Sequence, residues 1–140
     1  MLKKKKFAEN ILYKTNKKKI IVGVVGLGYV GLPLSILISK NGYIVYGFDT
    51  DINKIKNINL KKSYIDRISN KDVELIGKKG KFFNKVNKIA DCDIIIICVP
   101  TPLKKNKPDL KYLRDTVKSI KPYLRFGQVI ILESTSYPGT

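Results

Sequence analysis

A glycine-rich turn between two apolar runs most constrains the fold of this chain. The run Ile20–Val25 leads into Gly26-Leu-Gly-Tyr-Val-Gly31, a helical stretch follows, and a second apolar run, Tyr43–Phe48, ends at Asp49. The order strand, glycine turn, helix, strand and acid is typical of a unit that binds a dinucleotide. The pattern therefore predicts both a local fold and a class of ligand.

Each part of this pattern has a physical role. Gly26 permits the tight turn, Gly28 lets a pyrophosphate approach the backbone, and Gly31 lets the helix pack closely on the strand. The free N–H groups at the start of the helix favour the negative charge of phosphates. Asp49, about twenty residues past Gly28, is placed to accept hydrogen bonds from the adenosine ribose hydroxyls. Its charge repels a 2′-phosphate, so we expect NAD as the cofactor in preference to NADP.

From Ile20 onward, strand and helix patterns alternate, which is typical of an α/β fold. We predict a Rossmann-type doubly wound parallel sheet with helices on both faces and strand order 3-2-1-4-5. The loops at the carboxyl ends of the strands should share one cleft. Beyond the first two strands, the expected elements are helices over 30–41, from Ile52 past Ile58, from about Asn70 and over 108–125, a minor strand over 81–86, a central strand over 94–99 and a last strand over 129–132.

Residues 1–19 form a basic extension before the first strand. Phe7, Ala8, Ile11 and Leu12 recur there at helical spacing between lysine clusters, which predicts a short amphipathic helix. Such a helix can pack on the domain or on a second subunit, or it can attach to a membrane surface. The apolar stripe is narrow, so we expect packing and no membrane association.

Composition limits the classes of function. The 140 residues suit one domain, and neither a membrane-spanning run nor a signal peptide is present, so we expect a cytoplasmic protein. The net charge is +17, but the lysines are scattered through loops and helix faces, which favours a solvated basic surface over a nucleic-acid partner. Cys92 and Cys98, in a chain without histidine, offer no metal-ligand set and no disulfide framework.

Five short motifs carry a resemblance to a known family. They are Gly26-Leu-Gly-Tyr-Val-Gly-Leu-Pro33, Ser63-Tyr-Ile65, Cys98-Val-Pro-Thr-Pro-Leu103, Pro108-Asp-Leu110 and Glu133-Ser-Thr-Ser-Tyr-Pro-Gly-Thr140. In the order and spacing of these motifs, the chain resembles the N-terminal NAD-binding domain of the UDP-glucose/GDP-mannose dehydrogenase family. The Pro-Thr-Pro-Leu and Glu-Ser-Thr-Ser-Tyr-Pro-Gly-Thr forms are most similar to the branch that oxidises UDP-N-acetylglucosamine to a uronic acid for surface polysaccharides.

The resemblance implies roles for individual residues. Tyr29 and Val30 match the positions that contact the pyrophosphate, and Lys54 matches a basic residue at the adenosine end. Thr101 and Thr135 match two threonines near the cofactor, and Thr135 is also placed to orient water or substrate. Taken without the motifs, Tyr29 reads as a core aromatic, Lys54 as a solvated lysine and Thr101 as a turn residue.

Glu133 has two interpretations: a cleft acid, or a strand-end carboxylate satisfied by backbone N–H groups. The family's nucleophilic cysteine lies in a Gly-Gly-x-Cys motif beyond residue 140. Cys98 ends an apolar strand and Cys92 lies between two aspartates, so we expect both thiols to be inert.

The resemblance also implies which parts are missing. Residues 20–140 would be an NAD-binding Rossmann domain, incomplete at its C-terminus, without the catalytic and UDP-sugar-binding domains. The full-length enzyme would bind a UDP-sugar and form a homo-oligomer, whereas this chain alone would be inactive. Two alternatives stay open at this point: a UDP-glucose 6-dehydrogenase, and a stand-alone NAD-binding module without catalysis.

Overall fold

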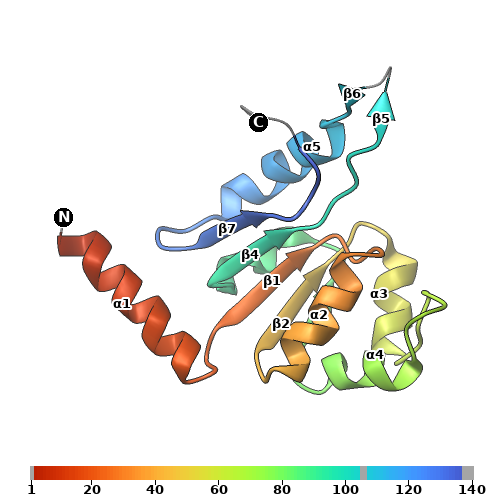
Figure 1. Cartoon of the computed structure of the whole chain (residues 1–140), viewed down its shortest axis with the longest axis horizontal. Helices are drawn as coiled ribbons and strands as arrows, with labels where there is room; N and C mark the ends of the chain where they lie inside the picture. The colour runs from red at the N-terminus through yellow and green to blue at the C-terminus, as the bar shows by residue number, and fades with distance from the viewer. Residues whose placement is uncertain (1, 105–106, 137–140) are drawn as a thin grey trace.

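The computed structural model describes residues 2–104 and 107–136, without the side chains of residues 2–5 and 107. Its main feature is a five-stranded parallel sheet in the order β3-β2-β1-β4-β7 (Figure 1). This order confirms the predicted 3-2-1-4-5 arrangement, with β7 as the fifth strand of the sheet. The strands are β1 (Ile21–Val25), β2 (Ile44–Phe48), β3 (Lys81–Phe83), β4 (Ile94–Ile97) and β7 (Val129–Leu132).

Helices cover both faces of the sheet, as predicted. Alternate side chains of a strand point to opposite faces, so Val22 and Val24 lie in one apolar cluster and Val25 in the other. The first cluster is completed by α2 (Gly31–Lys40), α3 (Ile52–Asn59) and α4 (Asn70–Gly77). The second is completed by α5 (Lys111–Ile120) and the 3-10 turn η1 (Val86–Asp91).

The last predicted helix is shorter than expected. It begins at Lys111 and ends at Ile120, where the chain continues as the 3-10 turn η2 (Lys121–Tyr123). Pro122 lacks the N–H group that another α-helical turn requires. The minor strand also ends early, at Phe83.

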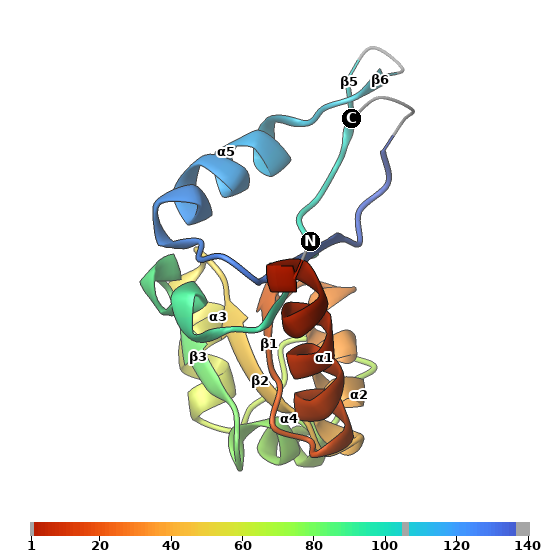
Figure 2. The same cartoon turned by 90° about the vertical axis from the view of Figure 1, so that its left-hand side faces the viewer.

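A two-stranded hairpin was not predicted from the sequence. It pairs β5 (Leu103–Lys104) with β6 (Lys107–Pro108) in antiparallel fashion. In Figures 1 and 2 this hairpin projects beyond the carboxyl ends of the strands. It follows Pro100-Thr-Pro102, whereas β4 itself ends at Ile97, two residues before the predicted end at Val99.

The N-terminal segment forms α1 (Leu2–Asn16), a helix that lies beside the sheet (Figure 2). Ile11 packs against the core on the α2 side, and the ring of Phe7 meets that of Phe126 edge-on at 6.2 Å between centroids. No helix in the described part of the chain is both long and apolar enough to cross a bilayer.

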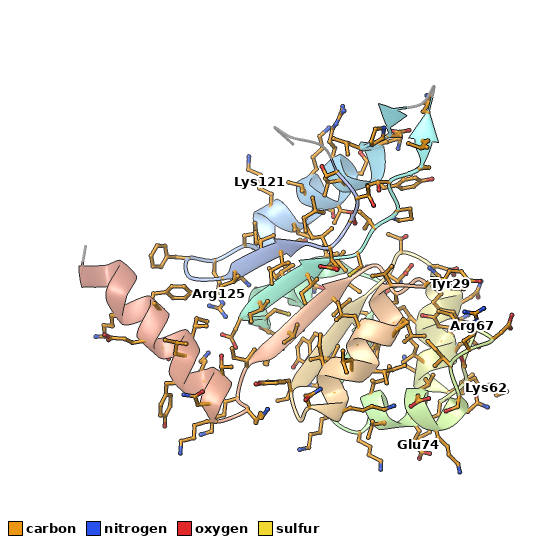
Figure 3. All side chains as sticks on the ribbon, in the orientation of Figure 1. Tyr29, Lys62, Arg67, Glu74, Lys121 and Arg125 are labelled. Carbon is orange, nitrogen blue, oxygen red and sulfur yellow. The ribbon has the colours of Figure 1, made fainter. Side chains whose placement is uncertain are left out.

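Asp93 joins α1 to the start of β1 and to the segment before β7. Its buried carboxylate accepts hydrogen bonds from Lys14 Nζ at 2.7 Å, Arg125 at 3.2 Å and the Ile21 N–H at 3.2 Å. Figure 3 shows Arg125 at the end of the sheet that faces α1. Burial alone would raise the pKa of Asp93, but the hydrogen bonds from Lys14 and Ile21, with the nearby positive charges, hold that pKa below its usual value.

We expect Asp93→Asn to lower the free energy of unfolding by about 2 kcal/mol at pH 7, because charged hydrogen bonds at a buried carboxylate are lost. A carboxylate with a lowered native pKa stabilises the fold above its unfolded pKa of about 4 and loses that contribution as pH falls through the native value. The difference from the unmodified chain should therefore shrink below about pH 4. Urea unfolding at pH 7 and pH 3 measures the difference in free energy of unfolding between the variant and the unmodified chain.

Asp91→Asn is the matched control, because Asp91 is exposed and its pairing with Lys88 spans 3.9 Å. Equal stability of the two variants at pH 7 contradicts the role given to Asp93.

Candidate cofactor site

A cleft of about 1090 Å³ lies at the carboxyl ends of the strands. The loops that follow β1, β2, β4 and β7 all line it, as expected for an open α/β sheet. Every sequence-predicted site residue except Gly31 lies on its wall: Gly26, Gly28, Tyr29, Val30, Asp49, Lys54, Thr101 and Thr135. Segments far apart in the sequence are thus brought to one site.

The three glycines of the turn meet different surroundings. Gly26 has φ +93°, and a Cβ there would lie 2.7 Å from the carbonyl oxygen of Cys98. A Cβ at Gly31 would overlap the carbonyl oxygen of Gly26, so Gly31 lies beneath the turn where helix and strand touch. A Cβ at Gly28 would have no atom within 4 Å. The open space needed for a pyrophosphate is therefore beside Gly28.

The start of α2 faces this open space with unused donors. In the described part of the chain, no hydrogen bond is made by the backbone N–H groups of Gly28, Tyr29 and Val30. Unpaired N–H groups at the start of a helix are suited to phosphate oxygens. These groups and the space beside Gly28 fit the phosphates of a dinucleotide.

Tyr29 is not a core aromatic, since 82% of it is exposed. Figure 3 shows it at the periphery of the view, beyond the end of the sheet. The side chain of Val30 is also exposed. Both residues are therefore free to meet a ligand in the cleft.

Asp49 is a nearly buried acid with several donors. Its Oδ2 accepts hydrogen bonds from the Leu27 N–H at 2.8 Å and from Lys54 Nζ at 3.0 Å. Its Oδ1 accepts one from the Asp51 N–H at 2.9 Å. Lys54 is thus paired within the cleft, and its reading as a freely solvated lysine is wrong. The carboxylate lies at the β2 end of the cleft, where the sequence pattern requires an acid.

The opposite wall of the cleft comes from the ends of β4 and β7. Thr101 is half-buried between two prolines, Thr135 is exposed, and both line the cleft. Ser134 Oγ donates to the Val99 carbonyl at 2.7 Å and ties the two loops together. The exposed side chain of Glu133 also reaches the cleft. The last motif residues, 137–140, lie outside the described residues.

Both cysteines are buried thiols. Burial and the negative charge of Glu133 raise the pKa of Cys98 to about 11. Burial and the charges of Asp91 and Asp93 raise the pKa of Cys92 to about 12. Each therefore stays protonated at neutral pH, which supports their assignment as inert. Within the described ranges, no three histidine, cysteine or acidic side chains are grouped to hold a metal ion.

Sequence reasoning missed part of the wall. Tyr64 lines the cleft from the loop between α3 and α4, and Asn84 does so after β3. Helix α5 adds a polar face: Tyr112, Asp115, Thr116 and Ser119. Their helical spacing in the sequence was the available signal for that face, and Tyr64 lies in one of the family motifs without an assigned role.

The comparisons with known proteins agree with this geometry. A model of the NAD-binding domain of the UDP-glucose/GDP-mannose dehydrogenase family matches residues 19–140. The chain belongs to this family. It is 38% identical over 124 residues to UDP-N-acetyl-D-mannosamine dehydrogenase of Pyrococcus horikoshii, a match that covers 85% of this chain and 29% of that protein. It is 36% identical over 123 residues to UDP-N-acetyl-D-glucosamine 6-dehydrogenase of Salmonella typhi, covering 86% and 28%.

Solved structures of the family have the same fold. The UDP-D-ManNAc dehydrogenase of Pyrococcus horikoshii superposes with a TM-score of 0.79 at 34% identity, covering 86% of this chain and 29% of that one. GDP-mannose dehydrogenase of Pseudomonas aeruginosa gives a TM-score of 0.74 at 30% identity, covering 84% and 29%. The chain thus spans less than a third of the length of these relatives. Its match is to the NAD-binding domain, so the cofactor is NAD.

Proposed function

We propose that this chain is the NAD-binding part of a nucleotide-sugar 6-dehydrogenase that oxidises the C6 hydroxyl of a UDP-N-acetylhexosamine to the uronic acid for surface polysaccharide. The observation that carries the proposal is the cleft, in which an open glycine turn lies beside Asp49. The names of the relatives support an N-acetylated UDP-sugar over UDP-glucose. The complete enzyme would act in the cytoplasm as a homo-oligomer.

Within this proposal, each wall of the cleft has a task. The N–H groups of Gly28, Tyr29 and Val30 bind the pyrophosphate, and Asp49 accepts the adenosine ribose hydroxyls. Bound NAD supplies the hydride acceptor for oxidation of the alcohol. Thr101 and Thr135 lie at the ends of β4 and β7, and we assign them to the nicotinamide end.

The role of Lys54 depends on Asp49, because Lys54 already pairs with this acid, which we assign to the ribose. Asp49 Oδ2 holds both Lys54 and the Leu27 N–H, and a carboxylate oxygen has about two lone-pair sites. Within the described chain, Oδ1 accepts only the Asp51 N–H, so a ribose hydroxyl can bind there while Lys54 stays on Oδ2. Lys54 then lies beside the ribose at the adenosine end of the cleft, which is the position that the family resemblance gives it.

The proposal is tested by transplanting residues 19–140 into two relatives in place of their matched segments. The hosts are the UDP-N-acetyl-D-mannosamine dehydrogenase of Pyrococcus horikoshii and the UDP-glucose dehydrogenase of Pyrobaculum islandicum. We expect NADH formation with the host's own sugar in the first chimera and little in the second, because the cleft loops must match the substrate-binding part. The reverse result favours the UDP-glucose alternative.

The isolated chain is the control for this experiment. Both of its thiols are buried and protonated, so we expect it to form no uronic acid from UDP-N-acetylglucosamine or UDP-glucose with excess NAD. Mass spectrometry would detect the product. Uronic acid formed by the chain alone, and lost in Cys98→Ser, contradicts the inert-thiol assignment.

A further inference from the structure

Both polar groups of Leu27, the residue between Gly26 and Gly28, are held by side chains. The Leu27 N–H donates to Asp49, and the Leu27 carbonyl oxygen accepts a hydrogen bond from the Tyr64 hydroxyl at 2.6 Å. The Leu27 side chain is itself fully buried. The middle of the glycine turn is therefore fixed from two directions by residues distant in the sequence.

Because the peptide bond is planar, the Tyr64 contact with the Leu27 carbonyl also affects the Gly28 N–H. The Leu27 carbonyl and the Gly28 N–H belong to one peptide plane and point in opposite directions, since the structure contains no cis bond in its described part. A hydroxyl that fixes the carbonyl thus fixes the direction of the Gly28 N–H. That N–H makes no hydrogen bond within the described chain, and Gly28 lines the cleft.

The loop that carries Tyr64 is itself well held. Ser63 Oγ donates to the Ile65 carbonyl at 2.9 Å and accepts from the Ile65 N–H at 3.2 Å. The Ser63 N–H donates to Asn70 Oδ1 at 2.8 Å, at the start of α4. Tyr64 therefore approaches the glycine turn from a fixed point. Burial, with the charges of Asp49 and Asp51, raises the pKa of the Tyr64 hydroxyl, so it remains a donor.

We propose that Tyr64 is a positioning residue for the dinucleotide: its hydroxyl orients the Leu27–Gly28 peptide so that the Gly28 N–H is preset toward the pyrophosphate. This inference rests on the proposed phosphate-binding role of the turn. It assigns a task to the Ser63-Tyr-Ile65 motif, which the sequence comparison leaves without one. Presetting the donor removes the cost of ordering it when the ligand binds.

The test is Tyr64→Phe, which deletes the hydroxyl and keeps the ring. One neutral hydrogen bond contributes about 1 kcal/mol, so we expect the Kd for NAD to rise about five-fold. ADP-ribose, which shares the pyrophosphate, should lose the same factor. Adenosine, which has no phosphate, should bind within about two-fold of its affinity for the unmodified chain, where two-fold is about 0.4 kcal/mol. Isothermal titration of the 140-residue chain measures all three ligands.

Tyr43→Phe is the matched control. Tyr43 is half-buried against the core on the α2 side, next to the start of β2 and with Lys18 Nζ 4.1 Å from its ring centroid, and it does not line the cleft. We expect this variant to bind NAD normally. A second readout needs no ligand: the Leu27 amide hydrogen should exchange faster with solvent deuterium in Tyr64→Phe than in Tyr43→Phe, because the turn is less firmly held.

Three outcomes overturn the inference: an unchanged Kd for NAD in folded Tyr64→Phe, an equal loss for adenosine, and an equal loss in Tyr43→Phe. If Tyr64→Phe does not fold, Ser63→Ala tests the inference in its place, because it loosens the loop and keeps Tyr64. A normal NAD affinity in Ser63→Ala also overturns the inference. Failure of the unmodified chain to bind NAD is a different result, since it contradicts the proposed function itself.

Discussion

Valine in place of Gly28 is expected to abolish NAD binding and to leave the fold intact. A Cβ at Gly28 has no protein atom within 4 Å, and φ at this position is not in the left-handed region, so we expect the fold to tolerate a side chain there. The space that it fills is the approach of the pyrophosphate to the backbone N–H groups. We expect the Kd for NAD to rise by on the order of 100-fold or more, which corresponds to about 3 kcal/mol of lost binding. Isothermal titration measures the loss, and circular dichroism measures the fold.

Gly77→Val is the matched control. Gly77 lies at the end of α4, outside the cleft, and a Cβ there also has no atom within 4 Å. This variant should bind NAD like the unmodified chain. If folded Gly28→Val retains the affinity of Gly77→Val, the glycine turn does not contact the dinucleotide.

The same substitution three residues later is expected to destroy the fold. A Cβ at Gly31 overlaps the carbonyl oxygen of Gly26 and lies 3.3 Å from the Cβ of Cys98. The Gly26 backbone cannot shift freely, because its N–H donates to the Phe48 carbonyl at 2.8 Å. We expect Gly31→Val to lower the free energy of unfolding by about 3 kcal/mol or more, as overpacking at a backbone contact does.

Thermal unfolding separates the two glycine variants. Gly28→Val should melt near the unmodified chain, whereas Gly31→Val should melt far below it or be unfolded at 25 °C. A Gly31→Val variant as stable as Gly28→Val would mean that α2 does not pack on β1 as closely as the structure shows.

The sheet could be predicted because its signals are local. Apolar runs of four to six residues separated by glycine, proline and asparagine mark strands, and right-handed crossovers leave one strand order. The predicted element ends differ from the structure because they depend on single residues such as Pro122, where α5 gives way to a 3-10 turn. The β5–β6 hairpin has no comparable signal, since each strand is two residues long.

The sequence predicted those residues of the candidate site that belong to one short, continuous pattern. Gly28 and Asp49 belong to a short pattern whose spacing is set by the fold. The partners of Asp49 and the Tyr64 contact with Leu27 depend on how α3 and the loop after it pack over the turn. The Tyr64 contact joins residues 37 apart, and such a contact follows from tertiary packing, which periodicity and spacing in the sequence do not encode.

The central claim is that the cleft binds NAD through Asp49 and the glycine turn, and calorimetric titration of the chain with NAD and NADP tests it most directly. We expect NAD to bind about ten-fold tighter, because a 2′-phosphate meets the Asp49 carboxylate. Asp49→Asn should narrow this preference, because it removes the repulsion. If the unmodified chain binds NADP as tightly as NAD, or more tightly, the account is contradicted. The attraction of the 2′-phosphate to Lys54 would then exceed its repulsion by Asp49.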